Sequence, residues 1–307
     1  MKILVLGAGG IGGYFGARLV EKGEDVVFLV REKRKQELER NGMVIKSTKG
    51  DFSFQPQLIT KDQTGDSIFD LVLFSTKSYH LTQAIEDLKP FIGEDTVIIP
   101  LLNGISHLDQ LKEAYGAEHV IGGLCQIETT LNDSGEVVHT SPFDKLVFGE
   151  LNEKKSDRID KIAATFSNTK AEFILSEQIL QDMWHKYLRI TILSGLTTLM
   201  RSPIGPIRES DNGTTFIAEL YEEVTTIMRM NQAPIADEVE EEQLNSIMTL
   251  SYDFKTSMQR DMEKGSLIEG DHIQGYLLKL ADNAKLEAPY LKAIYQNLKV
   301  YEQSLKV

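Results

Sequence analysis

Short apolar runs alternate with helix-like patterns along the first half of the chain, up to about residue 175. The apolar runs are compact and rich in branched residues, as are strands that helices cover on both faces. They are Ile3–Leu6, Val26–Val30, Leu71–Phe74 and Val97–Pro100. The intervening helical patterns are Ile11–Glu21, Leu81–Leu88 and Ser106–Ala114. This alternation predicts βαβ units and a parallel sheet.

A turn signal interrupts this alternation further along. The sequence Asn132–Gly135 lies between two strand-like runs, Ile127–Thr130 and Val137–His139. Asn, Asp, Ser and Gly favour tight turns, so the segment predicts a β-hairpin. We therefore expect a mixed sheet with an antiparallel edge.

The pattern changes after Lys170, where apolar residues recur at helical spacing and strand-like alternation disappears. The predicted helices are Gln178–Met200, Thr215–Met230, Val239–Arg260 and Asp271–Lys285. The predicted fold class is therefore α/β, with a dinucleotide-binding domain over residues 1–172 and an all-helical domain over residues 173–307.

Composition and charge narrow the classes of function. The 307 residues are 41% apolar and 26% charged, which is typical of a globular protein with room for two domains. The net charge of −13 gives no attraction to phosphate backbones or anionic lipid, so we expect no nucleic-acid or membrane partner. The single cysteine, Cys125, fits a reducing compartment.

Two further features exclude other classes. The uncharged run Ile3–Ala17 holds six glycines, which suits neither a signal peptide nor a membrane helix, so a cytoplasmic location is expected. The histidines are scattered singly without the spacing of metal ligands, so no metal site is expected.

A glycine loop follows the first predicted strand and opens the first predicted helix. Gly7, Gly9 and Gly12 form the pattern G-x-G-x-x-G. The first glycine allows a tight turn, the second lets a pyrophosphate approach, and the third lets helix and strand pack closely. The sequence therefore predicts a Rossmann-like dinucleotide site at Gly7, Gly9, Gly10, Ile11 and Gly12, although a merely structural glycine turn remains open.

The end of the second strand bears on the choice of dinucleotide. An NAD site usually offers Asp or Glu there to the ribose hydroxyls. This chain has Arg31, followed by Lys33 and Arg34. A guanidinium binds a 2′-phosphate by charge-assisted hydrogen bonds, so NADP(H) is the expected cofactor. The alternative is that Arg31 is a solvated surface charge.

At this point the whole chain resembles the ketopantoate reductase (2-dehydropantoate 2-reductase) family. Most of the motifs are short, but their order and spacing over some 270 residues are specific. Besides the glycine loop they are Ser75-Thr-Lys77, Leu101-Leu-Asn103-Gly104, Phe148-Gly149-Glu150, Trp184-x-Lys186, Ser257-Met-x-x-Asp261 and Glu269-x-Asp271-x-Ile-x-Gly275.

The resemblance implies an NADPH-dependent reductase of a 2-oxo acid and assigns roles to matching positions. Lys186 matches the catalytic lysine and Glu269 the substrate-binding carboxylate. Asn103 matches the asparagine beside nicotinamide and substrate. Lys77 matches a lysine near the cofactor, and Ser257 a serine that holds the substrate carboxylate.

The residue types suit this chemistry. Hydride addition to a ketone places negative charge on its oxygen, which an ammonium such as that of Lys186 stabilises and protonates. Structural alternatives stay open. In the structural alternative, Lys186 is a surface lysine on an apolar helix, and Glu269 stabilises the start of a helix. In the same alternative, Asn103 only forms a turn, and Ser257 is an ordinary position of an amphipathic helix.

One departure from the family concerns the substrate. The family tends to place asparagines one and two helical turns after the catalytic lysine, and another in the loop beyond. This chain has Ile190, Ser194 and Ile204 there. We expect 2-dehydropantoate reduction in pantothenate biosynthesis. A related hydroxy-acid or imine oxidoreductase, a non-catalytic NADP(H) sensor and a homodimer remain open.

Overall fold

The computed structural model describes residues 1–63 and 68–305 of the chain. Contacts divide it into two compact units. Unit 1 comprises Met1–Leu102 and His107–Ile179, and unit 2 comprises Asn103–Ser106 and Leu180–Val307.

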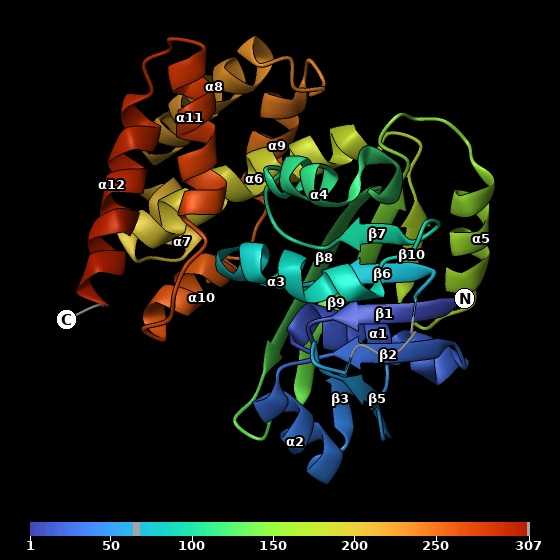
Figure 1. Cartoon of the computed structure of the whole chain (residues 1–307). Helices are drawn as coiled ribbons and strands as arrows, with labels where there is room; N and C mark the ends of the chain where they lie inside the picture. Colours follow the sequence, from blue (N-terminus) through green and yellow to red (C-terminus); the bar gives the residue numbers. More distant parts are fainter. Residues whose placement is uncertain (64–67, 306–307) are drawn as a thin grey trace. The chain divides into compact units, whose positions relative to one another are not determined.

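Unit 1 contains a five-stranded parallel sheet, which Figure 1 shows in blue to cyan. Its order is β5-β2-β1-β6-β7, and every neighbouring pair is parallel. The bounds are β1 (Lys2–Leu6), β2 (Asp25–Leu29), β5 (Gln57–Ile59), β6 (Leu71–Phe74) and β7 (Val97–Pro100). The predicted strands and their parallel pairing are confirmed, and the loops after β1, β2 and β6 leave the same edge of the sheet.

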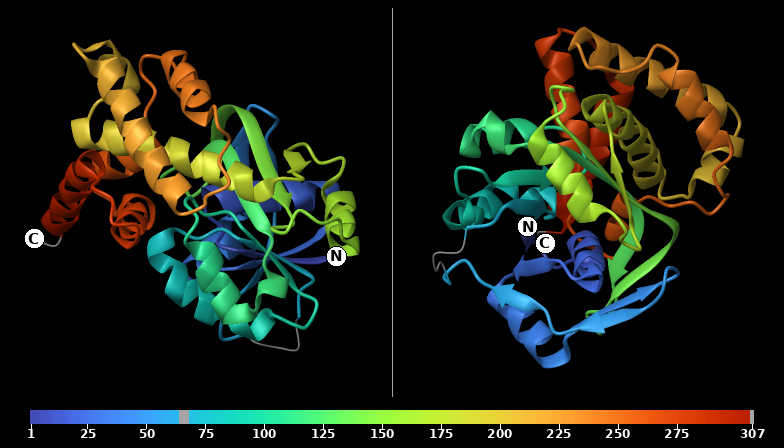
Figure 2. Two further views of the ribbon diagram at one scale, coloured as in Figure 1. Left: turned by 90° about the horizontal axis from the view of Figure 1, so that it is seen from above. Right: turned by 90° about the vertical axis from the view of Figure 1, so that its right-hand side faces the viewer.

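Helices cover this sheet, and α1 also packs against a second one. Besides α1 (Gly10–Lys22), the α-helices of unit 1 are α2 (Glu32–Asn41), α3 (Leu81–Leu88), α4 (His107–Tyr115) and α5 (Asp157–Phe166). Short 3₁₀ turns are η1 (Ser78–His80), η2 (Lys89–Phe91) and η3 (Ala117–His119). Helix α1 contacts β1, β2 and β6 on one side and β3, β8 and β9 on the other (Figure 2). Its burial from Gly12 to Leu19 follows from this double packing.

The second sheet is mixed and has the order β10-β9-β3-β4, with β8 paired to β9. Its strands are β3 (Met43–Ser47), β4 (Phe52–Phe54), β8 (Gly122–Leu131), β9 (Val137–Gly149) and β10 (Glu172–Leu175). The predicted hairpin is present, since β8 and β9 are antiparallel and Gly135 donates to the Asn132 carbonyl. The antiparallel strands thus lie in a separate sheet and do not edge the parallel one.

The end of unit 1 differs from the predicted domain boundary after residue 172. Strand β10 pairs in parallel with β9, from Glu172 opposite Lys145 to Leu175 opposite Phe148. This pairing ties the segment after residue 172 to unit 1, which continues to Ile179.

Unit 2 is helical and is built around α6 (Ile179–Met200). Residues 191–198 are all buried, as expected for a helix surrounded by others. The other elements are α7 (Ile204–Glu209), α8 (Gly213–Met230), α9 (Val239–Met248), α10 (Ser257–Glu263), the π-helix η4 (Asp271–Gly275), α11 (Tyr276–Asn283) and α12 (Pro289–Ser304). Over the described ranges, no helix is long and apolar enough to cross a membrane.

The single helix predicted over Val239–Arg260 is wrong. Helix α9 ends at Met248, and α10 begins after Thr256, whose side chain accepts from the Gln259 amide. The guanidinium of Arg208 donates to the Leu250 carbonyl at 2.6 Å and to the Ile247 carbonyl at 3.3 Å. These contacts satisfy carbonyls that a continuing helix would otherwise use.

Candidate active site

The glycine loop joins β1 to α1 in the conformation that its sequence predicts. Gly7 has φ +100°, and a Cβ on it would lie 2.9 Å from the Ser75 carbonyl oxygen. A Cβ on Gly12 would lie 2.1 Å from the Gly7 oxygen and 2.2 Å from Ser75 Oγ. Only glycine suits both positions, because a side chain would push α1 away from the sheet.

Gly9 differs from these two, since nothing lies within 4 Å of the place its Cβ would take. It is the N-cap of α1 and provides no side-chain hydrogen bond to the first turn. The first amides of a helix attract anions when no side chain caps them. Gly10 packs against Thr129 of β8, and Ile11 packs against the core of unit 1. The loop therefore fits a dinucleotide pyrophosphate.

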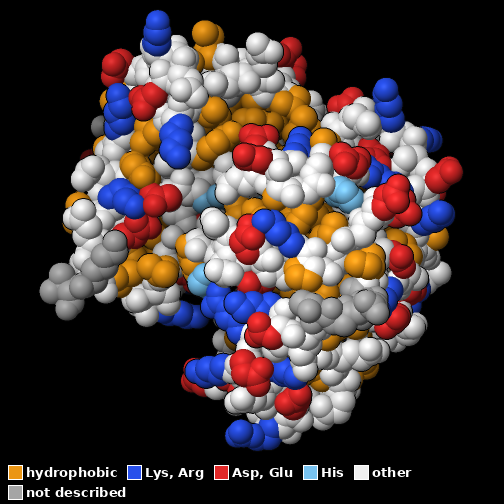
Figure 3. All heavy atoms as spheres, in the orientation of Figure 1, with side chains coloured by type: hydrophobic (Ala, Val, Ile, Leu, Met, Phe, Trp, Pro, Cys, Tyr) orange, Lys and Arg blue, Asp and Glu red, His pale blue; other side chains and the backbone are white. Residues whose placement is uncertain are grey.

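Arg31 lies where β2 leads into α2 and is exposed. Burial, together with the charge of Arg31, lowers the pKa of His80 at the end of η1. The guanidinium of Arg34 already has partners in the protein, since it donates to the Gly135 carbonyl at 3.0 Å and pairs with Glu37 at 3.3 Å. Figure 3 shows basic side chains mixed with acidic ones around α2. Arg31 is therefore the better candidate for a 2′-phosphate.

Lys77 follows the same edge of the parallel sheet, three residues after the end of β6. It is the N-cap of η1, and its carbonyl accepts from the His80 amide at 2.9 Å. Ser75, two residues earlier, donates through Oγ to the Gly7 carbonyl at 3.3 Å. The Ser75-x-Lys77 motif thus places one residue against the glycine loop and the other at the start of the turn that carries His80.

In unit 2, His272 of η4 joins two candidate site segments. Its Nδ1 lies 3.0 Å from Ser106 Oγ, and its ring also hydrogen-bonds the main chain of Asn103. Burial lowers the pKa of His272, while the nearby Glu269 carboxylate and the Asn103 contact act in the opposite direction. Glu269 is only 8% exposed. The structure therefore brings Asn103 and Glu269 to the same histidine.

Lys186 lies in the middle of α6 and is half-buried. The next residue, Tyr187, donates to the Ile273 carbonyl of η4 at 2.6 Å. One turn further on, Gln274 Nε2 donates to the Thr191 carbonyl at 3.1 Å. These buried bonds hold the helix of Lys186 against the element that follows Glu269.

Ser257 lies at the first position of α10 and is exposed, so the predicted setting within a longer helix is wrong. Of the three positions that depart from the family, Ile204 is fully buried, and Ser194 is 4% exposed and accepts from Gln274 Nε2 at 3.0 Å. Ile190 is half-buried. Packing within unit 2 thus explains two of these side chains.

Sequence reasoning missed His272 and Ser106. The six histidines have no metal-ligand spacing, so their positions in the sequence indicate no site. The available signal was that His272 follows Glu269 by three residues, about one helical turn.

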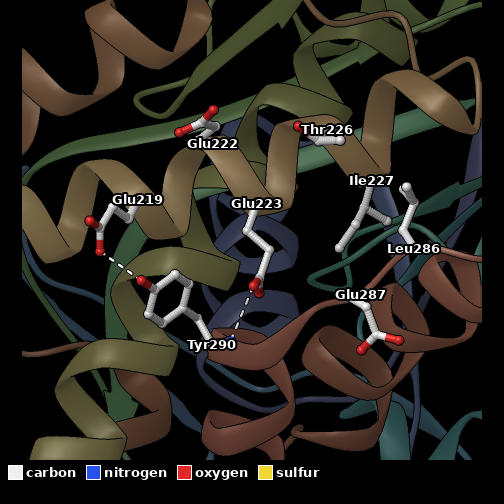
Figure 4. Close-up of a pocket in the computed structure, with 8 residues that line it drawn as sticks. All are labelled: Glu219, Glu222, Glu223, Thr226, Ile227, Leu286, Glu287 and Tyr290. Carbon is white, nitrogen blue, oxygen red and sulfur yellow. Dashed lines mark hydrogen bonds between the residues drawn. The ribbon is translucent and has the colours of Figure 1, made fainter.

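A separate hollow of about 340 Å³ lies in unit 2 between α8 and the start of α12 (Figure 4). Its lining is acidic, and the candidate site residues do not contribute to it. Tyr290 Oη donates to Glu219 at 2.7 Å, while Glu223 accepts from the amides of Tyr290 and Leu291 at 3.1 and 2.8 Å. These bonds cap α12, and the negative charge does not suit a carboxylate substrate.

The family follows from comparison with known proteins. The model for ketopantoate reductase PanE/ApbA matches residues 3–153, and the model for the C-terminal part of the same proteins matches residues 178–302. The chain therefore belongs to the ketopantoate reductase PanE/ApbA family and is an oxidoreductase of that family.

Individual relatives agree over almost the whole chain. An uncharacterized oxidoreductase of Bacillus subtilis (strain 168), YkpB, is 47% identical over 98% of this chain and 99% of its own length. A PanE/ApbA family ketopantoate reductase from Ralstonia eutropha JMP134 has a TM-score of 0.90 at 21% identity, with 100% of both chains covered. A D-mandelate dehydrogenase, solved with NADH and anilino(oxo)acetate, has a TM-score of 0.89 at 21% identity, again with 100% of both covered. The two structures share the fold.

Proposed function

We propose that this protein reduces a 2-oxo acid to a 2-hydroxy acid with NADPH, and that 2-dehydropantoate, reduced to pantoate, is its leading substrate. The observation that carries the proposal is the glycine loop, open at Gly9, in a chain whose helical unit brings Asn103 and Glu269 together at His272. Family membership supports the reaction class.

The cofactor site would use residues of unit 1. The uncapped start of α1 would hold the pyrophosphate, and Arg31 would pair with the 2′-phosphate. Lys77 would lie near the cofactor, as the family resemblance implies. Asn103, which the resemblance matches to an asparagine beside nicotinamide and substrate, belongs to unit 2. Bound NADPH would supply a hydride to the ketone carbon.

The helical unit would supply the groups that act on the substrate. The Lys186 ammonium would stabilise the negative charge that builds on the ketone oxygen and would donate the proton that completes the alcohol. Glu269 would accept a hydrogen bond from a substrate hydroxyl, and Ser257 would donate one to the substrate carboxylate. The low exposure of Glu269 would strengthen such a bond by excluding water.

A comparison with a solved structure favours a second function, that of a dehydrogenase acting on another 2-hydroxy acid. The same fold occurs in a D-mandelate dehydrogenase solved with NADH, so the fold is compatible with another 2-hydroxy acid and with the other dinucleotide. The departure at Ile190, which is half-buried, also points away from a strict copy of the family's substrate site.

The test is an absorbance assay at 340 nm with NADPH or NADH and a panel of 2-oxo acids, including 2-dehydropantoate, 2-oxoisovalerate and benzoylformate. Fastest NADPH oxidation with 2-dehydropantoate would support the leading proposal. A preference for benzoylformate with NADH would support the dehydrogenase reading. NADPH binding without turnover of any acid would favour a sensor. Sedimentation would test whether the protein is a homodimer.

A further inference from the structure

The ring of His272 connects two segments of unit 2 that are far apart in the sequence. Ser106 Oγ lies 3.0 Å from Nδ1 across 166 positions of the chain, and the ring also bonds the main chain of Asn103. Between these two residues, Gly104 has φ +82°, and a Cβ on it would lie 3.0 Å from the His272 ring. The turn therefore fits closely around the imidazole, and a side chain at Gly104 would displace it.

Two polar contacts hold the ring of His272. The contact with the Asn103 main chain favours the charged ring, so it is a donation from the ring to a carbonyl. The second contact joins Nδ1 to the Ser106 hydroxyl, and the tautomer of the ring decides which of the two atoms donates. The ring thus contacts the turn at both Ser106 and Asn103.

The backbone that carries His272 is also held in place. The element η4 is a π-helix in which Gly275 donates to the Gly270 carbonyl at 2.9 Å, while Ile273 donates to the Glu269 carbonyl at 3.0 Å. The next two residues, Ile273 and Gln274, are bonded to α6. Single π turns inside helical segments occur frequently at functional sites. The backbone that carries both Glu269 and His272 is thus fixed against the helix of Lys186.

We propose that His272 is a positioning residue for the reaction, which sets the turn carrying Asn103 against the buried carboxylate of Glu269. This inference rests on the proposed function, because it assigns His272 a task only if Asn103 and Glu269 bind the reacting molecules. The ring makes no contact with substrate in this role. It acts through the Asn103 main chain and through the spacing of the two segments.

The experiment compares His272→Phe, His272→Gln, Ser106→Ala and the double variant of Ser106→Ala with His272→Phe against the wild type, using the 2-oxo acid that the wild type reduces best. Phenylalanine keeps a flat ring but no hydrogen bonds, whereas glutamine keeps an N–H donor of similar reach. His119→Phe is the matched control, since its Nδ1 contacts the Thr96 carbonyl at 2.8 Å in unit 1. Each variant is measured for kcat, KM, NADPH affinity and melting temperature.

We expect His272→Phe to lower kcat/KM about 100-fold, as small displacements of positioned groups do. The loss should fall mainly on kcat, while NADPH affinity changes little. His272→Gln should recover about tenfold of the lost activity, and Ser106→Ala should weaken the effect of His272→Phe in the double variant. If His272 only stabilised the fold, His272→Gln would not regain activity over His272→Phe while the two variants have the same melting temperature.

The outcomes separate this inference from the proposed function. If the wild type is active and folded His272→Phe keeps kcat/KM within about threefold, the positioning role is wrong and the function stands. A loss that His119→Phe shares equally would also overturn it. If the wild type turns over no 2-oxo acid, the proposed function fails, and the role of His272 fails with it.

Discussion

The hydroxyl of Tyr187 donates to the carbonyl of Ile273 at 2.6 Å and so ties the centre of α6 to the π-helix η4. The side chain is fully buried, and burial holds the pKa of Tyr187 well above its usual value. The hydroxyl therefore stays protonated and keeps donating. Because Lys186 precedes Tyr187, this bond fixes the backbone that carries the proposed proton donor.

Replacing Lys186 by alanine should lower kcat about 100-fold or more, the scale of a lost general acid. NADPH affinity should be nearly unchanged, because Lys186 belongs to unit 2 and the glycine loop to unit 1. Lys279→Ala, at an exposed position of α11, is the matched control. Near-normal turnover by Lys186→Ala on the best substrate would remove Lys186 from the mechanism.

The wild type should bind NADPH at least about tenfold more tightly than NADH, which corresponds to about 1.4 kcal/mol. Arg31→Asp should reverse this order, since a carboxylate repels the 2′-phosphate. Aspartate is also a favourable N-cap, so α2 should still form. Fluorescence titration with both dinucleotides measures the effect, and Arg40→Asp at the other end of α2 serves as control. Equal affinities in the wild type would contradict the role of Arg31.

The glycine loop offers a matched pair of variants. Gly9→Ala should leave the melting temperature unchanged, because φ is −88° and nothing lies within 4 Å of the added methyl group. It should weaken NADPH binding at least about tenfold by occupying the space proposed for the pyrophosphate. Gly12→Ala should lower both stability and binding, since its methyl group would meet Gly7 and Ser75.

Calorimetry and NADPH titration of the two variants check this prediction. If Gly9→Ala binds NADPH as well as the wild type, the pyrophosphate does not lie against Gly9.

Substrate choice gives a further prediction. An aliphatic wall discriminates by about 1 to 3 kcal/mol per methylene, far less than a site built to bind a hydroxyl. Since Ser194 and Ile204 are buried within unit 2, the argument for an aliphatic wall now rests on Ile190. We expect appreciable reduction of 2-oxoisovalerate, which lacks the hydroxyl of 2-dehydropantoate.

Glu269 opposes this expectation, because a buried carboxylate is left without a partner when the hydroxyl is absent. Steady-state kinetics on both acids checks the balance. A preference for 2-dehydropantoate of about ten-thousandfold in kcat/KM would show that the polar site is intact.

Glu150 predicts a pH dependence of stability. Burial alone would raise the pKa of its carboxyl, but hydrogen bonds from Arg158 and Ser156 at 2.6 Å lower it. A lowered pKa in the folded state stabilises the protein above the unfolded-state pKa, and this stability is lost as the pH falls through the folded-state value. Glu150→Gln should therefore lower the free energy of unfolding by about 1 to 2 kcal/mol at neutral pH.

The difference between Glu150→Gln and the wild type should shrink as the pH falls from about 6 to about 3 in urea unfolding. Glu177→Gln is the control, because Glu177 is 80% exposed and its pair with Lys155 spans 3.9 Å. A constant difference across this range would exclude the charge of Glu150 as the cause.

Strands β1, β2, β6 and β7 could be predicted to within a residue because each contains a short, wholly apolar run, whereas the three-residue β5, which begins at Gln57, has no such run. The break at Met248 could not, since Arg208 and its bonds to the Leu250 and Ile247 carbonyls are contacts at long range. Helix α12 was missed altogether. Local periodicity carries information about burial, but the partners that end a helix lie elsewhere in the sequence.

The candidate site likewise combines a local motif, which could be predicted, with long-range contacts, which could not. The glycine loop is a local motif, so its turn and its close helix contact followed from spacing alone. The role proposed for His272 depends on Ser106, which the sequence separates by 166 positions. A single histidine among six gave no local sign of that partner.

The placement of Asn103–Ser106 with unit 2 means that the chain passes from one unit to the other three times, after Leu102, Ser106 and Ile179. A cut after Ile179 would separate the helical fragment from the hydroxyl that bonds His272. The helical half expressed alone would therefore lack part of the proposed site. A mixture of the two fragments would restore the contact between Ser106 and His272 only if the segment Asn103–Ser106 of the N-terminal fragment bound to the helical fragment.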